Sequence, residues 1–157
     1  MRHTLFRDIA CQWLSMQKLV ETKRVSFSAQ QMYELVAAVE HYGDFLPWCS
    51  GSRLLARDAQ SQTAEITVSK GPLRQRFTTR NDLEPPHRLG IALVSGPFRS
   101  LSGEWCFDDQ GEGSVVRLQL EFEFSNRLLG MTAGPVFREV NRAMVDAFVR
   151  RAQALYG

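Results

Sequence analysis

The sequence predicts a single α+β domain in which a curved antiparallel sheet of about seven strands wraps around a long C-terminal helix. Three observations support this prediction. The spacing of apolar residues changes from a period of 3.6 to a period of 2 between residues 52 and 124. Short turn sequences separate the strands of this stretch, which indicates an antiparallel meander. The last stretch, Gly134 to Tyr156, has no helix breaker after Pro135 and carries one apolar stripe.

Residues 1–15 stand apart from the domain pattern, which covers residues 16–157. We interpret them as an N-terminal extension that is either disordered or a short amphipathic helix, with a membrane-surface or targeting role as the alternative. Met16 is an alternative start of the chain. The apolar residues that recur at helical spacing in the extension are Leu5, Phe6, Ile9, Ala10 and Trp13.

The first strand is predicted over Lys18 to Phe27, where Val, Thr and Phe are frequent. Ser28 and Gln31 then form a Ser-x-x-Gln capping box, which marks the start of a helix. We expect this helix to end near residues 41–43. One short helical turn should follow and stop at Pro47.

Six more strands are predicted from alternating apolar and polar residues. The last of them, 114–124, alternates most cleanly. One face of the sheet should therefore be apolar and buried, and the other should be exposed to solvent. The sheet is wider than one helix can cover, so a gap between them is where a ligand would bind. The predicted strands are 52–57, 63–70, 73–83, 114–124 and two shorter ones around Leu89–Leu93 and Leu101–Phe107.

The final helix is predicted to begin with Pro135 at its first helical position, where the missing N–H costs nothing. Its length of about twenty residues corresponds to a rod of roughly 30 Å. Arg151 lies near the middle of the apolar stripe, and it either extends to the edge of the domain or faces a polar headgroup. The stripe consists of Val136, Phe137, Val140, Met144, Ala147, Phe148 and Leu155.

Composition excludes several classes of protein. The apolar fraction of 44% and the charged fraction of 23% are those of an ordinary globular domain. A net charge of +2 is too small for nucleic-acid binding by bulk charge, and no DNA partner is expected. Three widely spaced cysteines predict no metal site and a reducing, cytoplasmic compartment, with a peripheral position at the inner membrane as an alternative. No apolar run approaches the ~20 residues of a membrane span.

Four stretches together resemble one known family. The order of elements with these stretches resembles the START-like (SRPBCC) superfamily of helix-grip proteins, which includes the birch-pollen allergen. Within it the chain is similar to the coenzyme Q-binding and ribosome association toxin RatA family, over residues 18–157 but not over 1–15. The matching stretches are Phe45–Ser52, Phe77–Asn81, Gly96–Trp105 and Ala147–Ala152.

The resemblance implies a helix-grip fold with two short helices after the first strand. It also implies two activities. Mitochondrial members bind coenzyme Q and support respiration, whereas a bacterial member is described as a toxin that binds the large ribosomal subunit and blocks its joining to the small one. Relatives often carry the label oligoketide cyclase or lipid transport protein, and fold alone does not decide among these activities.

Binding of ubiquinone or another isoprenoid lipid requires a deep apolar tunnel, in which each buried methylene contributes ~0.8 kcal/mol. We expect no covalently bound cofactor. Thr79 and Asn81 lie on the apolar face of their strand, and they bond either to a quinone carbonyl or to neighbouring backbone. The apolar candidates either line a ligand cavity or pack in a hydrophobic core without a cavity. The predicted cavity residues are Phe45, Leu46 and Trp48 at the mouth, Phe77, Thr79, Asn81, Leu93, Phe98, Trp105 and Phe107 on the sheet, and Val140, Met144 and Phe148 on the helix.

Ribosome binding requires a basic surface. If Phe77 points inward, the arginines at alternate positions of its strand point outward together. Arginine pairs bidentately with phosphate, and such contacts make binding salt-dependent. An ordinary solvated face, interrupted by acids, is the alternative. The candidate RNA-binding residues are Lys70, Arg74, Arg76 and Arg80 near the sheet and Arg138, Arg142 and Arg150 on the last helix.

The sequence predicts no catalytic residue. The three histidines lie near turns or at the terminus, outside any pattern of an activated nucleophile. Cys49 is either a reactive thiol or a buried inert one. A cyclase would need an acid or base among the inward positions, which are almost wholly apolar. We therefore expect a protein that binds its ligand without chemistry.

Overall fold

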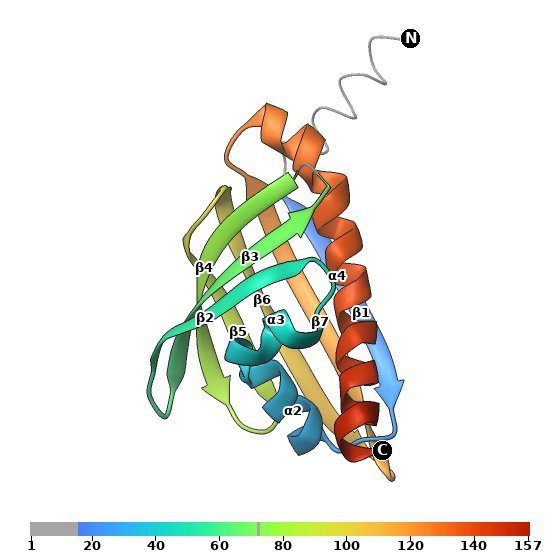
Figure 1. The fold of residues 1–157 in the computed structure, drawn as a ribbon. Coiled ribbons are helices and arrows are strands. Elements are labelled where there is room, and N and C mark those ends of the chain that lie inside the picture. Colours follow the sequence, from blue (N-terminus) through green and yellow to red (C-terminus); the bar gives the residue numbers. More distant parts are fainter. Residues whose placement is uncertain (1–15, 72) are drawn as a thin grey trace.

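The computed structural model describes residues 16–71 and 73–157 (Figure 1). The predicted N-terminal extension, 1–15, lies outside the described residues. Seven strands form one antiparallel sheet in the order β1-β7-β6-β5-β4-β3-β2. The elements are β1 (Gln17–Val25), α2 (Ala29–Ala37), the 3-10 turn η1 (Val39–His41), α3 (Tyr42–Phe45), β2 (Cys49–Arg57), β3 (Ser61–Lys70), β4 (Leu73–Glu84), β5 (Arg88–Ser95), β6 (Phe98–Gln110), β7 (Gly113–Phe124) and α4 (Arg127–Tyr156).

The predicted fold class is confirmed. Strands β2 to β7 follow one another as a meander, while β1 pairs with β7 and places Gln17 opposite Phe122. The sheet curves around α4, and α2 and α3 lie across the lower part of the concave side (Figure 1). This arrangement lets one curved apolar face and one helical stripe bury each other.

Alternation along the strands decides which side chains enter the core. In β7, Leu118, Leu120 and Phe122 are buried, whereas Arg117 is exposed. The same period of 2 brings aromatic rings from β4, β6, β7 and α4 together at one end of the core. Phe98 stacks on Phe124 with ring centroids 5.0 Å apart, and several further rings pack edge to face against them. The other rings of this cluster are Phe77, Phe122 and Phe137.

The first helix begins as predicted but ends earlier. The Ser28 hydroxyl accepts a hydrogen bond from the Gln31 backbone N–H at 3.1 Å, and the Gln31 side chain accepts one from Ser28 N–H at 2.9 Å. The predicted end near residues 41–43 is wrong, because α2 stops at Ala37 and a 3-10 turn follows.

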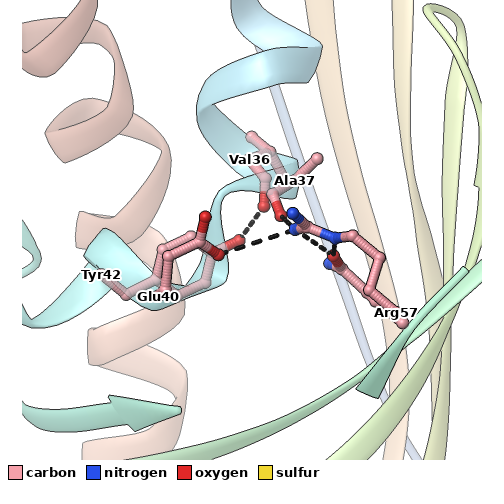
Figure 2. Close-up of polar contacts among 6 residues, drawn as sticks. Val36, Ala37, Glu40, Tyr42 and Arg57 are labelled. Carbon is pink, nitrogen blue, oxygen red and sulfur yellow. Dashed lines mark hydrogen bonds and ion pairs between the residues drawn. The ribbon is translucent and has the colours of Figure 1, made fainter. Parts of the chain in front are cut away.

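Side chains from elsewhere in the fold explain this early end. The buried Tyr42 hydroxyl donates to the carbonyl of Val36, and Arg57 Nη2 donates to the carbonyl of Ala37 at 2.8 Å (Figure 2). The last carbonyls of α2 thus have partners without a further helical turn. Arg57 also lies 3.6 Å from Glu40 Oε2, which connects β2 to η1.

The predicted start of the last helix is wrong as well. Helix α4 begins at Arg127, two turns before Pro135, and Asn126 caps it by accepting a hydrogen bond from Leu129 N–H at 2.8 Å. Proline inside a helix removes one backbone hydrogen bond. Burial of Ala133 and Gly134 in this part of the helix offsets that loss.

The predicted stripe of α4 is largely correct. Phe137, Val140 and Phe148 are buried, but Leu155 is 52% exposed. It lies in the last turn of α4, past Ala152, where the helix no longer faces the core.

Gly103 is required where β6 meets β7. A Cβ atom at this position would lie 2.1 Å from the carbonyl oxygen of Gln119. We expect Gly103→Ala to lower the free energy of unfolding by about 2 kcal/mol or more, because backbone atoms would have to move apart. Urea denaturation measures this loss.

Gly51→Ala is the matched control. A Cβ atom there would have its nearest neighbour 3.8 Å away, which is ordinary van der Waals contact. The control should be neutral, or more stable by up to about 1 kcal/mol, because alanine restricts the unfolded chain. Equal unfolding midpoints for the two variants would contradict the close approach at Gly103.

Candidate ligand-binding site

A cavity of about 110 Å³ lies between the concave face of the sheet and α4. It forms because α4 packs chiefly on β1, β7 and α2, so the other half of the curved sheet is covered only in part, by α2 and by the short α3. The loop from η1 to β2 covers this part from one side. The lining residues are Val39, Tyr42, Leu46, Pro47, Cys49, Ala64, Ile66, Val68, Phe77, Thr79, Asn81, Leu89, Ile91, Leu101, Trp105, Leu118, Leu120, Phe137, Val140, Asn141 and Met144.

Besides Tyr42, three amide or hydroxyl side chains interrupt the mainly apolar wall. Thr79 Oγ1 donates to Asn81 Oδ1 at 3.1 Å, so these two residues of β4 bond to each other. Asn141 Nδ2 on α4 donates to the Phe137 carbonyl at 2.8 Å. An amide has two N–H donors, and a hydroxyl can donate or accept. The site can therefore orient a ligand that carries carbonyl oxygens.

Two residues of the wall can ionise, and burial raises the pKa of both. The phenol of Tyr42 is fully enclosed, which holds its pKa far above the usual range. Burial also raises the pKa of the Cys49 thiol, whose Sγ donates a hydrogen bond to the Gly51 carbonyl. Both shifts favour the neutral form, which agrees with the interpretation of Cys49 as an inert thiol.

The described lining residues include no Asp, Glu, His, Lys or Arg. An aldol cyclase needs a general acid or base within hydrogen-bond reach of its substrate. Among residues 16–71 and 73–157 there is also no group of three His, Cys, Asp or Glu side chains that could hold a metal ion.

A contact that we call the clasp, formed by Trp48, Lys70 and Glu139, lies beside the cavity. Lys70 Nζ is 4.3 Å from the centroid of the Trp48 ring and 2.6 Å from Glu139 Oε1. Trp48 has a φ of 64°, a backbone conformation that is uncommon for an aromatic residue. The clasp connects the loop before β2, the end of β3 and α4. Pro47 and Val140, the sequence neighbours of Trp48 and Glu139, line the cavity.

Seven of the predicted cavity residues line the cavity, and their contact with a ligand stays a prediction. They come from the loop before β2, from β4, β6 and α4. Thr79 and Asn81 are 6% and 5% exposed, as expected for polar groups on an inward face. The seven are Leu46, Phe77, Thr79, Asn81, Trp105, Val140 and Met144.

The other six predicted cavity residues do not line it. Phe98 lies in the aromatic cluster, and Phe107 packs between Trp105 and Tyr33. Phe148 is surrounded by the rings of Tyr42, Phe45 and Trp105. Leu93 packs against the edge of the core, and Trp48 belongs to the clasp.

Phe45 has Arg151 above its ring. The guanidinium carbon lies 5.2 Å from the ring centroid. Arg151 therefore packs on an aromatic side chain and is absent from the cavity wall.

Sequence reasoning missed Asn141 and Tyr42. Asn141 is 2% exposed and lies four residues after Phe137 and three before Met144, within the predicted stripe. A polar residue inside an apolar stripe was the available signal. Tyr42 carried no such signal, because its place depends on the early end of α2.

The predicted basic residues lie on two separate surfaces. Arg74, Arg76 and Arg80 of β4 are exposed on the outer face of the sheet, and Arg53 of β2 lies 3.8 Å from the same carboxylate, Glu65, that Arg76 approaches at 3.9 Å. We call these four arginines the outer arginine face. Lys70 lies apart from it, in the clasp.

The basic residues of α4 face elsewhere. Arg138 donates to Gln17 Oε1 at 3.1 Å, and Arg142 lies 3.8 Å from Glu21, so both reach β1. Arg150 is exposed on the same helix. No helix in the described part of the chain has the length and hydropathy to cross a membrane.

Comparison with known proteins decides the family. Residues 25–149 match the family described as polyketide cyclase / dehydrase and lipid transport. The chain is also 42% identical over 143 residues to the ribosome association toxin RatA of Vibrio cholerae, covering 90% of this chain and 99% of that protein. The chain belongs to this family, in its RatA branch.

Two further proteins are similar to the chain, one in sequence and one in structure. The chain is 32% identical over 142 residues to the mitochondrial coenzyme Q-binding protein COQ10 homolog B of Xenopus laevis, covering 87% of this chain and 58% of that protein. A START superfamily protein from Mycobacterium smegmatis superposes with a TM-score of 0.72 at 18% identity, covering 88% of this chain and 98% of that one. The START-like fold is thereby confirmed.

Proposed function

We propose that the cavity binds a hydrophobic small molecule with a carbonyl-bearing ring, ubiquinone or a similar isoprenoid lipid, without catalysis and in support of respiratory electron transport. The observation that carries the proposal is the mainly apolar cavity with Thr79, Asn81 and Asn141 in its wall. The name of the Xenopus laevis relative, a coenzyme Q-binding protein, agrees with this ligand class. A cytoplasmic location, peripheral to the inner membrane, is part of the proposal.

The size of the cavity limits how such a ligand can bind. A volume of about 110 Å³ is below the ~300 Å³ at which drug-sized ligand sites begin. A ring fits this space, whereas an isoprenoid tail must displace part of the wall. Met144 on α4 and Leu46 before β2 are flexible side chains of the cavity wall, so they are the residues we expect to move.

The experiment is extraction of the protein purified from a ubiquinone-containing host, combined with native mass spectrometry. We expect one quinone or lipid per chain. Added ubiquinone should quench the fluorescence of Trp105, which is 3% exposed and lines the cavity. If the protein yields no ligand and shows no quenching, its core holds no ligand site and the proposal is wrong.

A second candidate function is binding to the large ribosomal subunit, which would block subunit association and translation initiation. The observation that favours it is the outer arginine face, in which Arg53 and Arg76 share one glutamate that is 20% exposed, while Arg74 and Arg80 are exposed beside them on β4. The Vibrio cholerae relative is named a ribosome association toxin. Cavity and outer face are separate surfaces, so the two functions are compatible.

Arg74→Glu/Arg76→Glu/Arg80→Glu tests this second function. We expect the triple variant to lose sedimentation with large ribosomal subunits, because each arginine that contacts a phosphate adds about one unit to the salt dependence of binding. Its extracted quinone should not change. Arg142→Glu/Arg150→Glu is the comparison on α4. Unchanged sedimentation of the triple variant would show that the outer arginine face is not the RNA-binding surface.

A further inference from the structure

The first turns of α4 carry exposed apolar side chains. Leu128 is 73% exposed and Met131 is 49% exposed. They are three residues apart, so they lie on the same side of the helix. Pro135, four residues further on, is exposed as well. Single exposed apolar residues are common on protein surfaces, but neighbouring ones at one tip of a domain mark an interaction site.

The meander places alternate turns at opposite ends of the molecule. The turns β3–β4 and β5–β6 and the link β7–α4 lie at one end, which we call the α4 end (Figure 1). The turns β2–β3, β4–β5 and β6–β7 lie at the other, which we call the hairpin end. The backbone hydrogen bond from Ser125 N–H to the Pro97 carbonyl, at 3.0 Å, holds two of the α4-end connections together.

Charge is distributed unequally between these two ends. The connections at the α4 end carry Lys70, Arg74, Arg99 and Arg127. Arg74 and Arg127 are exposed and make no ion pair with any other residue in the described part of the chain. The positive end of the α4 dipole adds to this charge. The turns of the hairpin end carry Asp58, Glu84, Asp108, Asp109 and Glu112.

Two acids near the α4 end pair with two of its four bases, so Arg74 and Arg127 carry its unpaired positive charge. Glu123 lies 3.6 Å from Arg99 and is only 18% exposed, and Glu139 is engaged by Lys70 in the clasp. At the hairpin end, the arginine in the β4–β5 turn, Arg88, is held by Glu84 and Glu104. The turns of the hairpin end are thus more acidic than the connections of the α4 end, although Lys23 and Arg24 of β1 and Arg150 of α4 also lie at the hairpin end.

We propose that the α4 end docks on an anionic membrane surface, with Leu128 and Met131 entering the boundary between headgroups and acyl chains and Arg74, Arg99 and Arg127 contacting lipid phosphates. Exposed apolar side chains with basic residues nearby are the combination that binds anionic membrane surfaces. An RNA surface would engage the arginines but leave Leu128 and Met131 in water. The hairpin end, with its acidic turns, would point away from the membrane.

If the cavity binds a lipid, as proposed above, this docking would also place the cavity near its source of ligand, because of where the clasp lies. Glu139 follows Met131 by eight residues, which is about 12 Å along a helix. Docking would bring the clasp, and the cavity beside it, close to the bilayer that holds isoprenoid lipids. The membrane would then be both the surface bound and the source of the ligand.

Sedimentation with vesicles of phosphatidylcholine, with and without phosphatidylserine, tests the docking. We expect the wild-type chain to bind only the phosphatidylserine vesicles, and Leu128→Asp/Met131→Asp to bind them at least about tenfold more weakly. Leu155→Asp is the matched control, because Leu155 is 52% exposed in the last turn of the same helix. All three chains carry the same residues 1–15, so a difference reports on the α4 end.

Four outcomes would overturn the proposal. They are a wild-type chain that does not bind, equal binding to vesicles without phosphatidylserine, an equal loss in Leu155→Asp, and unchanged binding of the double variant. Loss of ribosome sedimentation by the double variant, with vesicle binding retained, would assign the same tip to the ribosome. The vesicles contain no quinone, so an empty cavity would refute the proposed ligand without affecting this result.

Discussion

Replacing Val140 by arginine is expected to abolish co-purification of a quinone or lipid with the protein. Val140 is 8% exposed and its side chain forms part of the cavity wall. An arginine side chain would fill much of a space of about 110 Å³ and place a charge against apolar walls, which is costly without a partner. We expect the extracted ligand to fall by about a hundredfold or more, which corresponds to roughly 3 kcal/mol of binding free energy.

Two further variants separate the effect of filling the cavity from the effect of the added charge. Val140→Phe fills the cavity without adding a charge, and it should lower ligand binding by about tenfold at a stability cost of 1–3 kcal/mol. Gln153→Arg adds the same charge at an exposed position of the same helix and should bind ligand like the wild type. Retention of the ligand by folded Val140→Arg, or by Val140→Phe, would place the ligand outside this cavity.

Phe148→Ala is expected to remove a large part of the stability of the domain. Phe148 is 1% exposed, and the rings of Tyr42 and Trp105 lie 5.3 Å and 5.4 Å from its own. Truncation of a buried phenylalanine costs about 3–5 kcal/mol, because the cavity left behind collapses only partly. Single domains have free energies of unfolding of about 5–15 kcal/mol. Urea denaturation should therefore show a strongly shifted midpoint with an unchanged slope.

Tyr156→Ala is the control for this truncation. Tyr156 is an aromatic residue on the same helix, but it is 39% exposed and contacts only the ring of Phe27 among the described aromatic pairs. Its removal should cost less than about 1 kcal/mol. If Phe148→Ala were no more destabilising than Tyr156→Ala, the packing of α4 on α3 and β6 would not be the source of stability that the structure indicates.

The strands and their faces were predictable because side-chain alternation is a local property of the chain. Thr79 and Asn81 are buried on the inward face, and Arg76 and Arg80 are exposed on the outward one, as the period of 2 requires. The capping box at Ser28 was predictable for the same reason, since its partners are three residues apart.

The ends of the helices were less predictable, because contacts distant in sequence decide them. Helix α2 ends at Ala37, whose carbonyl accepts a hydrogen bond from Arg57, twenty residues further on. Helix α4 continues through Pro135 because residues around it are buried by the sheet and its neighbours. Neither partner can be read from the sequence of the helix itself.

Side-chain periodicity along the chain was enough to predict which side chains face inward, which face water, and that a helix must cover the concave sheet, because these follow from the repeat of a strand or a helix. Only the tertiary structure decided which inward residues reach empty space. Phe98 and Phe107 share the inward face with Trp105, yet only Trp105 lines the cavity. The physical reason is that α4 crosses one half of a curved sheet, so packing is tight along its path and incomplete beside it.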